Sequence, residues 1–114
     1  IVARNHPILR QTRSSYRRQI ELALLRDDRV SLQHRMTALL ASYFDVLFAL
    51  NELPHPGEKR LVPYVMVHCD QRPPDFDRRL HGLLAAAQTP AVLGHLDPLL
   101  DDLDALLAAN HLID

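Results

Sequence analysis

The sequence is poor in several residue types, and each shortage excludes a class of protein. A single cysteine, Cys69, excludes an internal disulfide framework and any cysteine-rich zinc module. Tryptophan is absent and aromatic residues are only 5% of the chain, too few to interleave with the arginines for stacking on single-stranded nucleic acid. No apolar run approaches the ~18 residues that a membrane span requires, and no cleavable signal peptide is recognisable. We therefore expect a cytoplasmic protein without membrane contact.

The residues that are abundant favour helices. The chain has 22 leucines and 12 alanines against three glycines, and leucine and alanine lose little side-chain freedom in a helix. Its 114 residues, 47% apolar and 24% charged, predict one globular domain spanning residues 1–114. The first residue is Ile1 and not methionine, so we expect this domain to be part of a longer protein.

The net charge of −1 hides an uneven distribution. The balance is +5 in residues 1–35, −1 in residues 36–87 and −5 in residues 88–114, which contain five Asp and neither Lys nor Arg. An arginine-rich segment can contact phosphates, or it can pack against an acidic helix. Without interleaved aromatic residues we favour the second interpretation and expect no nucleic acid partner. Complementary charges can also pair between two chains, so a homodimer remains an alternative.

Local patterns predict where the first two helices begin. The His6–Pro7 pair disfavours a helix before Ile8, because a residue that precedes proline avoids helical backbone angles. Ser14 or Ser15 is a suitable N-cap for a helix that follows it. From Arg29 to Asn51, after an N-cap at Asp28, apolar residues recur at i, i+3, i+4 and i+7, which predicts a long amphipathic helix at the centre of a bundle.

The second half of the chain predicts shorter helices. Two prolines and Gly57 end the long helix, and residues 61–69 have no partner strand, so we expect a helix from near Gly57 that Pro63 disturbs. Asp75 and the Thr89–Pro90 and Asp97–Pro98 pairs are typical of helix starts. The predicted fold is all-α, an antiparallel helical bundle of about five helices, whose last helix ends at Asn110 in a left-handed conformation.

Motifs for catalysis or metal binding are missing. The seven histidines include no i, i+4 pair and no HExxH motif, so we expect no metal site. The Asp75-Phe76-Asp77 and Asp102-Leu103-Asp104 pairs lie in helical patterns, where residues two apart diverge, and we interpret them as helix-start and solvated residues. Arg29 and His34 fit the Arg-x4-His spacing of helical HEPN ribonucleases, which keeps that activity as a further alternative.

The best binding candidate follows the long helix. Lys59 is the only lysine beside 12 arginines, and it lies two residues after the Pro56–Gly57 turn, where we expect a new helix to begin. Free N–H groups at a helix start, together with Lys59 and Arg60, make an anion site, and we expect the amine to face an open groove. The alternative is an ordinary turn with a solvated charged corner.

The same segment resembles a known family. The residues YFDVLFALN (43–51), a short loop and HPGEKRL (55–61) look like the helical C-terminal region of bacterial nucleotidyltransferases related to aminoglycoside adenylyltransferases. The resemblance covers roughly residues 30–70. It implies that the chain is the C-terminal, substrate-binding part of such a protein. The Gly-Ser turn and Asp-x-Asp strand of the catalytic domain, which would use ATP and Mg²⁺, are absent from the sequence.

The resemblance also implies roles for individual residues. Lys59 matches a lysine that touches the nucleotide's phosphates, with Arg60 and Glu58 as neighbours, and Asp45 and Asn51 would line the cleft. We therefore expect a helical domain that binds nucleotide or a small-molecule acceptor together with a missing N-terminal catalytic domain. It would hold no cofactor and perform no catalysis alone. The alternative from a different class is a non-enzymatic helical dimerisation or interaction module.

Overall fold

Six α-helices form the secondary structure of residues 1–12 and 15–113, the part of the chain that the computed structural model describes. They are α1 (Val2–Arg10), α2 (Tyr16–Leu25), α3 (Arg29–Leu50), α4 (Leu61–His68), α5 (Phe76–Ala85) and α6 (Val92–Ala109). No strand occurs in these residues. The predicted all-α class is confirmed, with six helices where about five were expected. None of these six is long and apolar enough to cross a bilayer.

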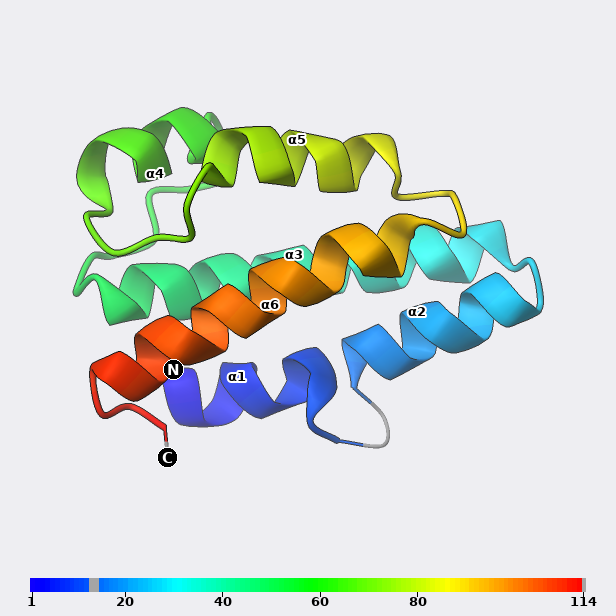
Figure 1. Cartoon of the computed structure of the whole chain (residues 1–114), viewed down its shortest axis with the longest axis horizontal. Coiled ribbons are helices and arrows are strands. Elements are labelled where there is room, and N and C mark those ends of the chain that lie inside the picture. The colour runs from blue at the N-terminus through cyan, green and yellow to red at the C-terminus, as the bar shows by residue number, and fades with distance from the viewer. Residues whose placement is uncertain (13–14, 114) are drawn as a thin grey trace.

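The long helix α3 is the centre of the fold, as predicted. Figure 1 shows α1 and α2 on one side of it and α4 and α5 on the other, with α6 between the two pairs. The Asp28 carboxylate accepts a hydrogen bond from the Ser31 N–H at 3.1 Å, so the predicted N-cap is confirmed. The helix ends at Leu50, and Asn51 is its C-cap. Ten of its 22 residues are buried. Neighbouring helices therefore cover α3 on several sides, and not only along one apolar stripe.

Aromatic rings join α3 to α5 in the core. The ring centroids of Tyr43 and Phe44 lie 6.0 Å apart, and Phe76 lies 6.3 Å from Tyr43 and 6.2 Å from Phe44. Such offset and edge-on pairs add to the free energy gained from burying apolar area. Below them, α6 contributes a row of buried leucines at helical spacing: Leu96, Leu99, Leu100, Leu103 and Leu107.

The N-terminal helix α1 contradicts the prediction that no helix precedes Ile8. Pro7 lies inside α1, where it removes the hydrogen bond that a residue there would donate to the Ala3 carbonyl. Tertiary contacts offset this loss. The His6 ring and Leu9 are buried, and His6 Nε2 lies 2.5 Å from Asp104 Oδ1 of α6. A pattern read along one segment contains no information about a partner almost a hundred residues away.

The basic N-terminal helices pack against the acidic last helix within one chain. Arg10 Nη1 lies 2.8 Å from Asp101 Oδ1, and Arg17 Nε lies 2.9 Å from Asp97 Oδ1. The interpretation that the two ends of the chain pair intramolecularly is therefore confirmed. The start of α2 was also predicted: Ser15 is its N-cap and accepts from the Arg18 N–H at 3.2 Å. Ser14, the other candidate cap, lies outside the described residues.

The helix predicted for residues 61–69 exists as α4, but it begins later than expected. Arg60 adopts a left-handed conformation (φ 55°) and is the N-cap, so the predicted start near Gly57 is wrong. Pro63 is the third residue of α4, in the first turn, where a backbone N–H has no helical partner to lose. The predicted disturbance by Pro63 is therefore also wrong.

Two predicted caps have other roles. Asp75 precedes α5, but its carboxylate makes no capping bond and instead pairs with Arg78 at 3.2 Å. The Asp97–Pro98 pair does not start a helix, because α6 begins at Val92 and continues through Pro98. Asp97 is held by Arg17 from α2, and the buried leucines on both sides of Pro98 stabilise the continuous helix.

A chain with three glycines uses other residues for left-handed helix ends. Asp27, Glu52 and His111 have φ values of 52°, 57° and 60°, and each follows the C-cap of α2, α3 or α6. Asn110, predicted to be the left-handed residue, is the C-cap with φ −99°, and His111 takes the left-handed position. At each end the next N–H bonds back into the last turn, as Leu53 N does to Phe48 O at 2.9 Å.

Candidate functional site

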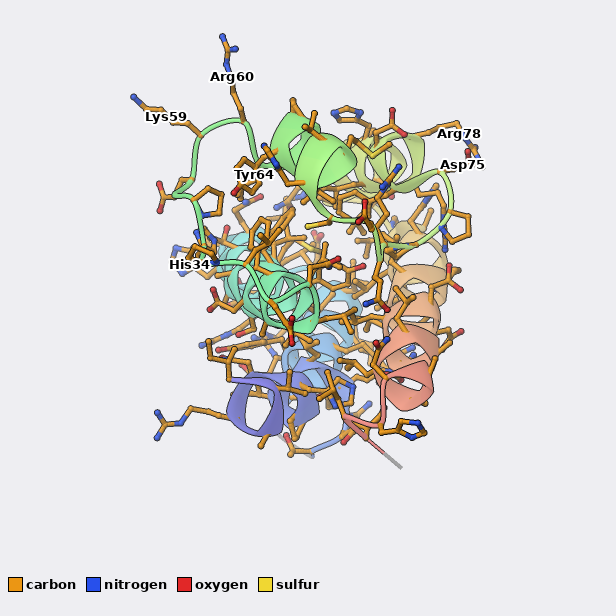
Figure 2. All side chains as sticks on the ribbon, turned by 90° about the vertical axis from the view of Figure 1, so that its left-hand side faces the viewer. His34, Lys59, Arg60, Tyr64, Asp75 and Arg78 are labelled. Atoms are coloured by element: carbon orange, nitrogen blue, oxygen red, sulfur yellow. The ribbon has the colours of Figure 1, made fainter. Side chains whose placement is uncertain are left out.

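The loop between α3 and α4 carries the predicted anion-binding residues on an open surface. Gly57 has φ 102°, a conformation that a side chain would strain, and its N–H donates to His55 Nδ1 at 3.0 Å. Lys59 and Arg60 are both exposed. Figure 2 shows their side chains pointing away from the body of the molecule, at the end where α3 passes into α4. The loop therefore holds two adjacent cations outward.

Neither cation has a partner among the described residues. Among residues 1–12 and 15–113, the side chains of Lys59 and Arg60 form no ion pair and no hydrogen bond. Most described arginines differ, because seven of them are in ion pairs. These are Arg10, Arg17, Arg18, Arg26, Arg29, Arg78 and Arg79. Arg4 and Arg35 are also exposed and unpaired, but they lie on other helices and are not adjacent in sequence.

The groove expected at Lys59 is not among the cavities described below. Neither Lys59 nor Arg60 lines any of the cavities described below. The helix start also supplies fewer amides than expected. Because α4 begins after Arg60 and Pro63 has no N–H, only Leu61 and Val62 present free N–H groups in its first turn. An anion bound here would need a second surface to enclose it.

The two residues predicted to line a cleft lie in different surroundings. Asp45 is half-buried on α3 and lines none of the cavities described here. The Asn51 side chain joins α3 to the segment after α4: its Nδ2 donates to the Gln71 carbonyl at 2.8 Å, and its Oδ1 accepts from the Gln71 N–H at 3.0 Å. Asn51 therefore has a clear structural role. It also lines a cavity, which Asp45 and Lys59 do not.

That cavity lies at the end of the bundle and has a volume of about 290 Å³, near the lower limit for ligand pockets. Three helices end at it, because Leu50, His68 and Asn110 are the last residues or C-cap of α3, α4 and α6. Asn110 Nδ2 donates to Gln71 Oε1, which continues the amide network. Sequence reasoning missed Gln71 and Asn110 as site residues. Only their positions at or shortly after helix ends could have indicated them.

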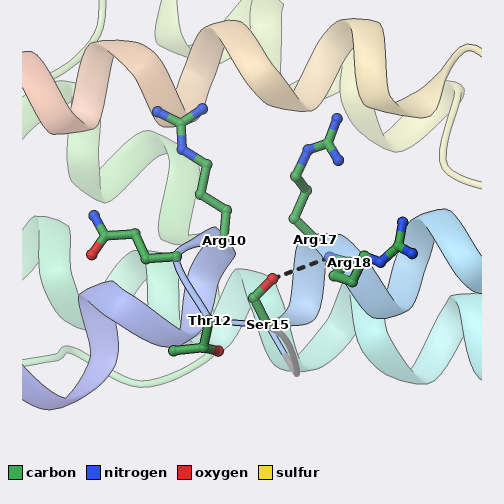
Figure 3. Close-up of a pocket in the computed structure, with 6 residues that line it drawn as sticks. Arg10, Thr12, Ser15, Arg17 and Arg18 are labelled. Carbon is green, nitrogen blue, oxygen red and sulfur yellow. Dashed lines mark hydrogen bonds between the residues drawn. The ribbon is translucent and has the colours of Figure 1, made fainter.

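A larger cavity of about 600 Å³ lies where α1 meets α2. Figure 3 shows Arg10, Arg17 and Arg18 beside it, with Ser15 bonded to the Arg18 N–H. Its arginines are engaged elsewhere. Arg17 donates from Nε and Nη2 to the two Asp97 oxygens at 2.9 Å each, and Arg18 pairs with Glu21. Since these guanidiniums are already neutralised by carboxylates, the cavity offers less to an anion than its lining suggests.

The other sequence candidates are dispersed or occupied. Arg29 and His34 are both exposed on α3, five residues apart and therefore about 140° apart around the helix, so they do not face one ligand. In the Asp-x-Asp pair of α6, Asp104 pairs with Arg10 and Asp102 with Arg79, so these residues are not merely solvated. Burial raises the pKa of the Cys69 thiol, which disfavours a reactive thiolate. Within the described ranges, no three His, Cys, Asp or Glu side chains are placed to hold a metal ion.

Comparison with models of protein families, with curated proteins and with solved structures finds no match. Any assignment of function must therefore rest on the sequence and structure of this chain.

Proposed function

We propose that this chain is a non-catalytic helical domain that binds the phosphates of a nucleotide through Lys59 and Arg60, at a site completed by a second domain. The proposal follows the resemblance of residues 43–61 to the helical region of nucleotidyltransferases. The single observation that supports it most is that these two adjacent cations have no carboxylate partner in the described chain, whereas most described arginines do.

The surroundings of the two cations suit a phosphate group. Lys59 is a compact charge and Arg60 a planar fork, and both bind phosphate oxygens. They directly precede α4, whose N-terminal end carries a partial positive charge. Because they project from the surface, they can reach a ligand held on an opposing domain. In this arrangement the chain supplies charge and the other domain supplies the remainder of the site, including the Mg²⁺ that accompanies a nucleotide.

The chain's own acidic pairs support a non-catalytic role. Two-metal phosphoryl or nucleotidyl transfer needs carboxylates that are free to hold metal ions. In α6, Asp102 and Asp104 are used by Arg79 and by Arg10 and His6. The paired charges also bear on the dimer alternative, because that alternative was motivated by complementary charges at the two ends. The described aspartates of α6 are all paired within the chain, so we do not propose a dimer on this basis.

The proposal is tested by titrating the 114-residue chain with MgATP at low ionic strength and following amide chemical shifts by NMR. For the chain alone we expect weak binding, with a Kd in the millimolar range, and shifts centred on residues 57–62. The Lys59→Ala/Arg60→Ala double variant should weaken binding about 2- to 30-fold, as expected for two exposed charges.

The matched control is the Arg4→Ala/Arg35→Ala double variant. It removes the same charge from two exposed, unpaired arginines at other places. It should leave the affinity for MgATP unchanged. An equal loss of affinity in both double variants would mean that only net charge matters, and the assignment of Lys59 and Arg60 would be wrong.

A further inference from the structure

The helix that follows the two cations is apolar but only partly covered. Of the eight residues of α4, only Val65 is fully buried, and Val67 is 73% exposed. An apolar helix gains stability by burying such residues, so its position on the surface is unusual for a purely structural element. This exposed surface continues directly from the loop that carries Lys59 and Arg60.

A row of rings crosses this surface. The centroid of the His55 ring lies 5.2 Å from that of Phe48, which lies 5.8 Å from Tyr64, and Tyr64 lies 4.3 Å from His68. Phe48 is buried and anchors the row, whereas His55 and His68 are exposed and Tyr64 is half-buried. Exposed rings can stack on a nucleobase, and such stacking tolerates any base because every base has a π-face.

The rings follow the cations along α4. Arg60 is the N-cap of this helix, and its carbonyl accepts a hydrogen bond from the Tyr64 N–H at 3.1 Å. A helix rises about 6 Å over four residues, so Tyr64 and His68 lie about 6 and 12 Å beyond Arg60 along the helix axis. Arg60, Tyr64 and His68 therefore form a stripe along α4 with a charged end and a ring end.

At its far end the stripe meets the cavity of about 290 Å³. His68 belongs to both, and Asp70 and Gln71 line the cavity beside it. The Asp70 carboxylate has no partner among the described residues. Polar groups next to a stacking surface can bond the edge of a base that lies on the rings.

We propose that Tyr64 and His68 form the surface on which the base of a nucleoside phosphate stacks, while its phosphates contact Lys59 and Arg60. This inference rests on the proposed function and extends it from the phosphates to the base. It makes the ligand class a nucleoside phosphate and not a free polyphosphate. Helix α4 is then the element that distinguishes a nucleoside phosphate from a free polyphosphate.

The test compares ATP with inorganic triphosphate, which carries the phosphates without the base. Both are titrated into the 114-residue chain in separate NMR experiments, with equal Mg²⁺ and ionic strength. We expect ATP to bind about 5-fold or more tightly, as one base–aromatic stack predicts. Saturation transferred from the Tyr64 and His68 ring protons to the adenine protons should accompany it.

His68→Ala should bring the affinity for ATP down to that for triphosphate, without affecting triphosphate binding. The matched control is His34→Ala, which removes an exposed histidine from α3. Tyr64→Leu is a second variant that keeps apolar contact with Phe48. Because His68 is exposed, its variant reports on binding even if the Tyr64 variant unfolds.

The outcomes separate this inference from the proposed function. Equal affinity for ATP and triphosphate, both sensitive to Lys59→Ala, would overturn the base-stacking surface and leave the phosphate contacts standing. Equal effects of His68→Ala and His34→Ala would overturn it as well. Absence of binding for both ligands would overturn the proposed function, and the stacking surface with it.

Discussion

The ion pair between Arg17 and Asp97 offers the sharpest test of how this fold is held together. It joins α2 to α6 across 80 residues of sequence, with Nε–Oδ1 and Nη2–Oδ2 distances of 2.9 Å each. A two-pronged contact of this kind fixes the relative position of the two helices as well as their charges. We propose to remove each side in turn with Arg17→Gln and Asp97→Asn, and then both together.

The size of the effect follows from geometry and exposure. Hydrogen bonds to charged groups contribute about 1.5–3 kcal/mol, whereas fully exposed ion pairs contribute about 0.2–1 kcal/mol. The side chains of Arg17 and Asp97 are 26% and 35% exposed, so solvent screens part of the interaction. We therefore expect a coupling energy of about 1–2 kcal/mol from the double-mutant cycle. In a chain of this size, that corresponds to a fall in Tm of a few degrees.

The assay is urea unfolding of the four proteins at pH 7, followed by circular dichroism. Hydrogen bonding from Arg17 lowers the pKa of Asp97. A carboxylate whose pKa is lower in the folded state adds stability above its unfolded pKa of about 3.9, and that stability disappears as pH falls through the folded pKa. Wild type should therefore exceed Asp97→Asn in stability at pH 7 and lose this advantage progressively below about pH 4.

Two results would refute this reasoning. A coupling energy near zero at pH 7 would mean that the contact orients the two helices without stabilising the fold. A coupling that grows with protein concentration would mean that the acidic and basic helices pair between two chains, which would restore the dimer alternative. Sedimentation equilibrium of the wild type over the same concentrations separates the second result from a general loss of stability.

Two further substitutions test local features of the fold. The Tyr43 hydroxyl is buried without a hydrogen-bond partner in the described residues, so Tyr43→Phe should leave stability unchanged or raise it by about 1 kcal/mol in urea unfolding. A clear loss would reveal a bonded hydroxyl. Glu52 holds φ 57° at the end of α3, so Glu52→Gly should raise stability by about 0.5–1 kcal/mol, whereas Glu52→Ala should not. Equal effects of the two variants would exclude backbone strain as the cause.

The helices could be predicted from sequence wherever local chemistry decides them. Asp28 and Ser15 cap α3 and α2 through their own side chains, a contact made within three residues. Asp97–Pro98 shows the limit of such patterns, because the same residue type was expected to start a helix. It lies inside α6, held by Arg17. Whether an aspartate caps or pairs depends on which arginine the fold brings near it.

The prediction for the N-terminal helix was wrong for the same reason. Pro7 is unfavourable inside an isolated helix, and tertiary contacts of α1, such as the burial of Leu9 and the contact of His6 with Asp104, offset its cost. The C-terminal ends of α3 and α6 were predicted to within a residue, yet the left-handed residue was placed at Asn110, one position before His111. Residue preference favoured asparagine there, while the hydrogen-bonding pattern of the last turn decides the position.

The sequence indicated the candidate residues Lys59 and Arg60, but not their surroundings in the fold. Lys59 stands out as the single lysine in the sequence. The structure adds that Lys59 and Arg60 have no partner within the described residues, whereas seven arginines there pair with carboxylates. Sequence shows which charges exist, and only the fold shows which of them are neutralised. The rings of Tyr64 and His68 were invisible for a related reason, since an apolar helix is expected to be buried. The groups of a candidate binding surface are those that stay exposed or unpaired after folding, so they can be identified only once the folded structure is known.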